Sequence, residues 1–276
     1  MPIPITALRR LYEFMGAATS SNFHRALAAE LCRKPQVLVD LVENSWGHFS
    51  TYSNPGVAFH DRPPFGEPLP AVYENNAATC RLVVTLHQKA MRFQDELLAF
   101  EYVDYEVCPN RTRNHAVFED GTSRRGSPMD LLLRCPSSHL PIIGEVKNAA
   151  LGNEDKNALF ALIQGLMYSV ELLTSNQRLR LAEIYADEEG RPRFSNPTEG
   201  PYGDLYLILI NHPEGGGWRH ELLERTDQLA GSMMRETNAV TRLLRRIVCL
   251  NAKLVPEGAG EQANFNTLFV HSSCST

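Results

Sequence analysis

The stretch PMDLLLRCPSSHLPIIGEVK, residues 128–147, decides how we interpret this chain. Two apolar runs, 129–135 and 140–147, lie on either side of a short polar segment, which is typical of two strands joined by a turn. Side chains on a strand alternate between its two faces, so Glu145 and Lys147 point the same way. The stretch therefore predicts a β-hairpin whose second strand presents an acid and a base on one face.

The register of this hairpin brings two carboxylates together. With the turn centred on Ser137 and Ser138, Asp130 lies directly opposite Glu145, at a Cβ separation of about 4.5–5.5 Å. Two carboxylates at that separation repel each other unless a cation lies between them, and Mg²⁺ binds oxygen ligands at about 2.1 Å. Lys147, one pleat along, can hold a water molecule or stabilise charge on a phosphate. A register shift of one residue would turn Asp130 to the other face.

A simpler interpretation of the same residues is that they have no role. Glu145 and Lys147 would then be a solvated pair at the end of a strand, and Asp130 would only begin one. We favour a functional site because the strand around Glu145 is apolar on both faces, which indicates a covered strand. Charges in such a strand are costly unless they are paired or bind a metal.

The surrounding sequence predicts an α/β protein. Short helices are expected within 1–46, followed by a Pro-rich connector at 53–70, a helix at about 77–100, a strand at 102–107 and a loop at 108–127. After the hairpin we expect a helix that ends at about 174; Asn153 caps its start, and Glu154 and Asp155 lie in its first turn. An insertion at 186–203, a strand at 204–210 and a further helix at 218–250 complete the prediction. The central order of helix, three strands, helix and strand is typical of a sheet with helices on its faces.

We divide the chain into three parts. These are a helical N-terminal extension with the connector (1–70), an α/β core (71–211), and a C-terminal helical segment with a tail (212–276). The last part carries an apolar stripe at helical spacing, which indicates helix core, with a homodimer contact as the alternative. The stripe comprises Leu222, Leu229, Met233, Leu243, Leu244 and Ile247.

Composition and charge restrict the function. The 276 residues are 43% hydrophobic, and neither a membrane-spanning run nor a secretory signal is evident, so we expect a cytoplasmic protein with no membrane partner. The six cysteines form no C-x-x-C pair, which disfavours a zinc site built from cysteines. The net charge of −5 counts against a chain that coats nucleic acid, so such contacts would need local basic patches. The candidate arginines, with ordinary charged surface as the alternative, are Arg111, Arg113, Arg124, Arg125, Arg242, Arg245 and Arg246.

Three short motifs together resemble a known family. They are Pro128-Met129-Asp130, then Gly144-Glu145-Val146-Lys147, then the pair Gln164 and Tyr168, which share one face of a helix at spacing i, i+4. Over residues 77–211 this combination is similar to the PD-(D/E)XK nuclease superfamily, particularly its RecB-like branch.

The resemblance implies a restriction-endonuclease-like core and hydrolysis of phosphodiester bonds in nucleic acid, with DNA favoured over RNA. It also implies that Asp130 and Glu145 bind Mg²⁺ or Mn²⁺, and that Lys147 assists the attacking water. Gln164 and Tyr168 would support the site or contact the substrate backbone.

One position of the family pattern stays open. The family places a further acid, or in the RecB-like branch a histidine, on the helix before the first strand. His87 and Glu96 are candidates on opposite sides of that helix, and Glu106 is a third.

Two rival interpretations also stay open. One is a catalytically silent member of the same fold that binds nucleic acid or protein, and the other is an α/β interaction protein in which Asp130 and Glu145 face different ways.

Overall fold

The structure is a computed structural model. It describes residues 5–18, 20–52, 78–88, 92–94, 98–109, 116–118, 120–121, 123–124, 128–149, 157–187, 189–213, 217–258 and 260–273. Several sequence predictions lie outside these residues: the connector at 53–70, Glu96, Arg111, Arg113, Arg125, and the cap formed by Asn153 with Glu154 and Asp155.

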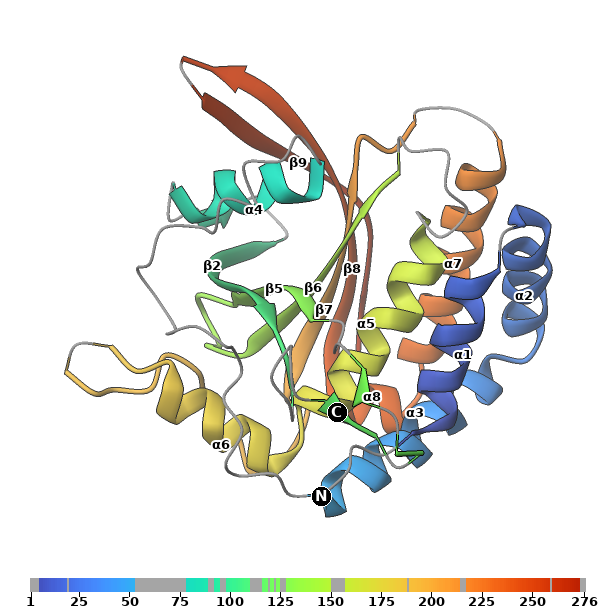
Figure 1. The fold of residues 1–276 in the computed structure, drawn as a ribbon, viewed down its shortest axis with the longest axis horizontal. Helices are drawn as coiled ribbons and strands as arrows, with labels where there is room; N and C mark the ends of the chain where they lie inside the picture. Colours follow the sequence, from blue (N-terminus) through green and yellow to red (C-terminus); the bar gives the residue numbers. More distant parts are fainter. Residues whose placement is uncertain are drawn as a thin grey trace.

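A seven-stranded mixed sheet forms the centre of the molecule, with strand order β1-β2-β5-β6-β7-β8-β9 (Figure 1). Its strands are β1 (Arg92–Gln94), β2 (Ala99–Val107), β5 (Met129–Arg134), β6 (Pro141–Asn148), β7 (Gly203–Ile210), β8 (Leu244–Glu257) and β9 (Gly260–Ser272). β6, β7 and β8 run parallel, and the other neighbouring pairs are antiparallel. A separate pair consists of β3 (Ala116–Val117) and β4 (Ser123–Arg124).

Helices cover both faces of this sheet, so the α/β class predicted from the sequence is confirmed. The described helices are α1 (Ala7–Ala17), α2 (Ser21–Arg33), α3 (Pro35–Thr51), α4 (Ala78–Gln88), α5 (Ala158–Leu172), α6 (Ser175–Ile184), α7 (Trp218–Met234) and α8 (Ala239–Leu243). α4 packs on one face, and α5 packs on the other beneath α1, α3 and α7 (Figure 1). Every residue of α5 is buried, as expected for a helix with apolar residues on all sides, although Gln164, Ser169 and Glu171 are buried with them.

The β5–β6 hairpin has the register predicted from the sequence. Leu131 pairs with Gly144 and Leu133 pairs with Ile142, as the predicted register requires. Next to these pairs, Asp130 accepts a hydrogen bond from the backbone N–H of Val146, which holds it beside Glu145. Gly144 permits this close pairing, because a Cβ atom at that position would lie 2.8 Å from the Cβ of Leu131. The sequence of the hairpin therefore positions both predicted carboxylates.

The structure contradicts two of the predicted helices. The helix expected at 77–100 ends at Gln88, and the chain then enters β1 and β2. The helix expected at 218–250 is broken into α7 and α8, and from Leu244 onward the chain forms β8 and then β9. Residues 247–250 are apolar and fully buried, and a short continuous apolar run suits a central strand as well as a buried helix. The structure also adds α6, within a segment for which no helix was predicted.

Two smaller features complete the fold. α5 begins at Ala158, where the side chain of Asn157 caps it by accepting a hydrogen bond from the backbone N–H of Phe160 at 2.9 Å. Among the described residues no single helix is long and apolar enough to span a membrane, although α5 and α6 taken together across an 83° bend meet that length and composition.

Candidate active site

The five predicted site residues lie together on the face of the sheet that α5 covers. Asp130 is on β5, Glu145 and Lys147 are on β6, and Gln164 and Tyr168 are on α5. The two β6 residues share the face of Ile143, which packs in the core beneath α5. The helix that follows β6 thus lies over the sheet beside Lys147, as predicted.

A chain of hydrogen bonds links α5 to both strands. Lys147 Nζ donates to Glu145 Oε1 at 2.5 Å and to Gln164 Oε1 at 2.8 Å. Gln164 Nε2 donates to the Tyr168 hydroxyl at 3.4 Å, and that hydroxyl donates to the carbonyl oxygen of Pro128 at 3.1 Å. Because Pro128 directly precedes β5, this series of hydrogen bonds ties Lys147 of β6 to α5 and to the start of β5.

The two carboxylates are held differently. Asp130 Oδ2 accepts a hydrogen bond from the backbone N–H of Val146 at 2.8 Å, which ties the side chain of Asp130 to β6. Glu145 uses Oε1 for the bond from Lys147, but its Oε2 is buried and has no hydrogen-bond partner among the described residues. A buried oxygen without a donor is costly, so this atom is a natural ligand for a cation.

The charges of the site act strongly on one another. Glu145 is fully buried, and burial together with the charge of Asp130 raises the pKa of Glu145 well above its usual value. Burial acts to lower the pKa of Lys147, but the charges of Glu145 and Asp130 outweigh burial and raise that pKa, so Lys147 is an ammonium group. Two acids thus compete for one lysine in the interior, an arrangement that a divalent cation would relieve.

These residues fit a hard divalent cation. Mg²⁺ is bound by oxygen ligands and keeps several waters, so one or two carboxylates are enough to hold it. Among the described residues no group of three or more His, Cys, Asp or Glu side chains is placed to hold a metal ion. Asp130 and Glu145 are thus the two carboxylates of this site that could hold such a cation.

The candidates for a further site residue lie in different parts of the molecule. His87 lies on α4, on the opposite face of the sheet from Lys147, and its Nδ1 is 3.5 Å from the hydroxyl of Tyr102. Glu106, at the end of β2, has a φ of 49°. Burial and then the charges of Glu106 and Asp130 raise the pKa of Cys80, so these two acids lie near the same thiol. His87 thus lies on the opposite face of the sheet from Lys147. The β2–β5 register, with Tyr105 opposite Leu131 and Val107 opposite Met129, brings Glu106 beside Asp130.

Aromatic residues that the sequence analysis missed cover the site. The ring of Phe160 is 5.3 Å from Lys147 Nζ, and the ring of Tyr12 on α1 stacks on Phe160 at 5.3 Å. Phe160 precedes Gln164 by one helical turn, so its spacing could have placed it on this face, whereas no sequence pattern points to Tyr12. As a result Lys147 is only 6% exposed.

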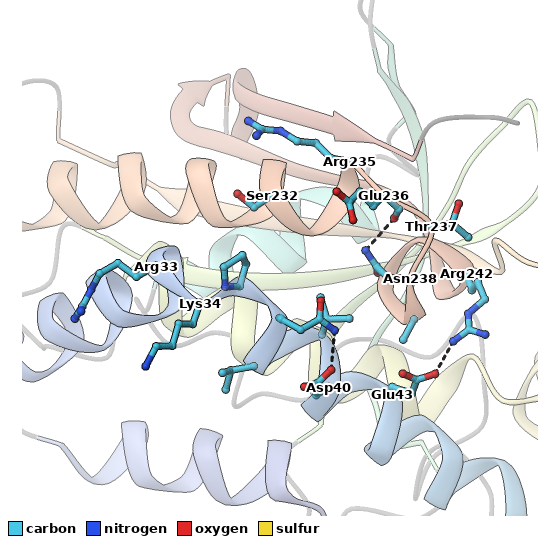
Figure 2. Close-up of a pocket in the computed structure, with 15 residues that line it drawn as sticks. Arg33, Lys34, Asp40, Glu43, Ser232, Arg235, Glu236, Thr237, Asn238 and Arg242 are labelled. Carbon is cyan, nitrogen blue, oxygen red and sulfur yellow. Dashed lines mark hydrogen bonds and ion pairs between the residues drawn. The ribbon is translucent and has the colours of Figure 1, made fainter.

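A cavity elsewhere on the molecule does not belong to this site. It has a volume of about 1000 Å³ and lies between the start of α3, the end of α7 and α8 (Figure 2). Residues of both charges line it, and some of them pair with each other, as Arg242 does with Glu43 at 2.7 Å. The neighbouring Arg245 forms an ion pair with Asp204, so the predicted arginine cluster is engaged in pairs within the protein.

Comparison with protein-family models, with curated proteins and with solved structures finds no match to this chain.

Proposed function

We propose that this protein is a metal-dependent nuclease that hydrolyses phosphodiester bonds, with DNA as the favoured polymer. The observation that carries the proposal is that Asp130, bonded to the backbone N–H of Val146, lies beside Glu145 and Lys147, and that the buried Oε2 of Glu145 has no hydrogen-bond partner among the described residues. The resemblance of the three motifs to PD-(D/E)XK nucleases supports the same conclusion, as does the order of α4, β2, β5, β6, α5 and β7.

Each residue has a distinct role in the proposed reaction. Asp130 and Glu145 would hold Mg²⁺ or Mn²⁺, which when bound supplies Lewis acidity and lowers the pKa of a water molecule. Lys147 orients the attacking water and stabilises the charge that develops on the phosphate. Gln164 holds the lysine in place through its Oε1, and Tyr168 anchors Gln164 to the backbone before β5. The water oxygen forms a bond to phosphorus and gives up a proton to the solvent, the bond to the leaving oxygen breaks, and the leaving oxygen takes up a proton.

A second candidate function is that of a catalytically silent protein of the same fold that binds nucleic acid or another protein. The observation that favours it is burial, because Glu145 is fully buried and Lys147 almost so. A scissile phosphate must approach both residues closely, which the described arrangement of α1 and α5 does not permit without movement. The net charge of −5 also favours this candidate.

A cleavage assay distinguishes the two functions. The full chain is incubated with single-stranded DNA, double-stranded DNA and RNA in Mg²⁺, Mn²⁺ or EDTA. Asp130→Asn and Lys147→Met test the site. Asp40→Asn and Lys34→Met are matched controls, because they make the same changes at exposed positions around the separate cavity.

Metal-dependent cutting that the two site substitutions abolish and the two controls leave intact would support the nuclease. A folded protein that binds a metal ion but cuts none of the three polymers would support the silent module instead. Cutting that survives both site substitutions would refute the assignment of these residues.

A further inference from the structure

A second cluster of reactive groups lies at the other end of the sheet. It consists of Cys135, Ser137, Asp204, Tyr206, Arg245 and Arg246, and we refer to it as the Cys135 cluster. On β7, Asp204 pairs with Ile142 and Leu209 pairs with Lys147. Asp204 therefore lies five residues from the part of β7 beside Lys147, which is roughly 16 Å along a strand. Cys135 packs in the core beneath α4, on the opposite face of the sheet from Lys147. The cluster is therefore separate from the candidate active site.

Two guanidinium groups face the sulfur of Cys135. Arg245 Nη2 donates to the sulfur at 3.1 Å, and Arg246 Nη2 is 4.0 Å away. The Ser137 hydroxyl is 3.4 Å from the same sulfur. Asp204 is fully buried and accepts two hydrogen bonds from Arg245, at 2.6 and 3.0 Å, so Arg245 is fixed in this orientation. The strands thus hold cationic donors around one thiol.

Tyr206 lies two residues from Asp204 along β7, so the two side chains share one face of that strand. Tyr206 is fully buried, and its hydroxyl has no hydrogen-bond partner among the described residues. Burial, and then the charge of Asp204, raises the pKa of this hydroxyl, and the charges of Arg246, Cys135 and Arg245 also act on it. The phenol therefore lies within the field of the whole cluster. Because buried hydroxyls are normally hydrogen-bonded, the cluster offers a donor to a small polar molecule.

The surroundings of Cys135 favour its thiolate form. Burial acts to raise the pKa of Cys135, but hydrogen bonds from Ser137, Ser138 and Arg245 outweigh burial and lower that pKa to about 6. The sulfur is therefore mostly ionised at pH 7, and the thiolate is the nucleophilic form of cysteine. Cys32 and Cys80 are more exposed, but burial raises the pKa of each of them.

We propose that Cys135 is a peroxide-reactive cysteine, which hydrogen peroxide oxidises to sulfenic acid in a site built by Arg245, Arg246 and Tyr206. The sulfur attacks one oxygen of the peroxide, a sulfur–oxygen bond forms and the oxygen–oxygen bond breaks. The sulfur is oxidised by two electrons and the peroxide is reduced, and the departing hydroxide takes up a proton to become water. Arg246 and the Tyr206 hydroxyl donate to the departing oxygen, where negative charge develops.

Competition among the cysteines of one chain tests this proposal. The folded protein is treated with limiting hydrogen peroxide at pH 7 in the presence of dimedone, which traps sulfenic acids, and the adducts are located by peptide mass spectrometry. Cys135 is only 2% exposed, so exposure alone favours reaction at Cys32 and Cys80. We expect the adduct at Cys135 to exceed that at either of the others by on the order of tenfold, since its greater ionisation outweighs the lower nucleophilicity of a more acidic thiol. Earlier labelling of Cys32 or Cys80 would overturn the proposal.

A Tyr206→Phe variant tests the site rather than the thiol alone. The substitution removes a hydroxyl that has no hydrogen-bond partner among the residues that the structure describes, so we expect the fold to be preserved. We expect peroxide oxidation of Cys135 to slow about tenfold, which corresponds to one lost hydrogen bond in the transition state. Alkylation by iodoacetamide has no departing oxygen to stabilise, so its rate should stay unchanged. Equal peroxide rates in the wild type and the variant would refute the role of Tyr206.

Discussion

The buried ion pair between Glu145 and Lys147 allows a quantitative test of the site by a double-mutant cycle. The variants are Glu145→Gln, Lys147→Met and their combination. The two charged atoms are 2.5 Å apart, and the side chains are 0% and 7% exposed. Removing one partner of a buried pair leaves an uncompensated charge and costs about 3 kcal/mol, whereas replacing both partners removes that charge. We therefore expect about 3 kcal/mol of destabilisation from each single change and no more than that from the double change, a coupling of about 3 kcal/mol.

Urea unfolding in EDTA measures this coupling without a contribution from bound metal. Asp187 and Arg191 provide a matched control, because their charged atoms are 2.6 Å apart but lie in an exposed turn. Water screens an exposed pair, so its coupling should be much smaller. If the Glu145–Lys147 cycle gave no more coupling than the exposed pair, the electrostatic account of the site would be refuted.

Three further predictions concern single positions. Gly144→Ala should destabilise the protein by about 1–3 kcal/mol in urea unfolding, since its Cβ would lie 2.8 Å from that of Leu131; an unchanged midpoint would show that the hairpin is not closely paired there. Tyr168→Phe should cost about 1 kcal/mol of stability, through the lost bond to the Pro128 carbonyl, and should slow cleavage while metal binding persists; loss of metal binding in a calorimetric titration would contradict this supporting role. Burial acts to raise the pKa of Cys135, but hydrogen bonds outweigh it and lower that pKa to about 6, so the alkylation rate of Cys135 should rise with a midpoint near pH 6 and level off above pH 7. A rate that still rises at pH 9 would refute the assignment of a stable thiolate.

The candidate site could be predicted from sequence because its determinants are local. Asp130 and Glu145 belong to one hairpin, whose short turn and alternating side chains determine the register, and the observed pairing of Leu131 with Gly144 agrees with it. Gln164 lies on the next helix, which has to pack on the same sheet. Short-range rules of this kind were sufficient to bring the five residues together.

Features that depend on distant parts of the chain could not be predicted in this way. The apolar run at 247–250 became a strand because β7 offers it a parallel partner, and no residue within the run encodes that neighbour. The stacking of Tyr12 on Phe160 joins α1 to α5 without any motif. The Cys135 cluster is a similar case, because β7 and β8 bring Asp204 and two arginines to the end of a hairpin that precedes them in the chain.

Direct measurement of metal binding tests the central claim, that Asp130 and Glu145 share a divalent cation. Mn²⁺ is titrated into the full chain, and the free ion is followed by electron paramagnetic resonance. We expect one Mn²⁺ per chain in the wild type, loss of that site in Asp130→Asn and in Glu145→Gln, and retention in Asp40→Asn. Lys147→Met should retain the site as well, because it removes a positive charge that competes with the metal for Glu145. Mn²⁺ binding that survives both carboxylate substitutions, or no binding by the folded wild type, would contradict the claim.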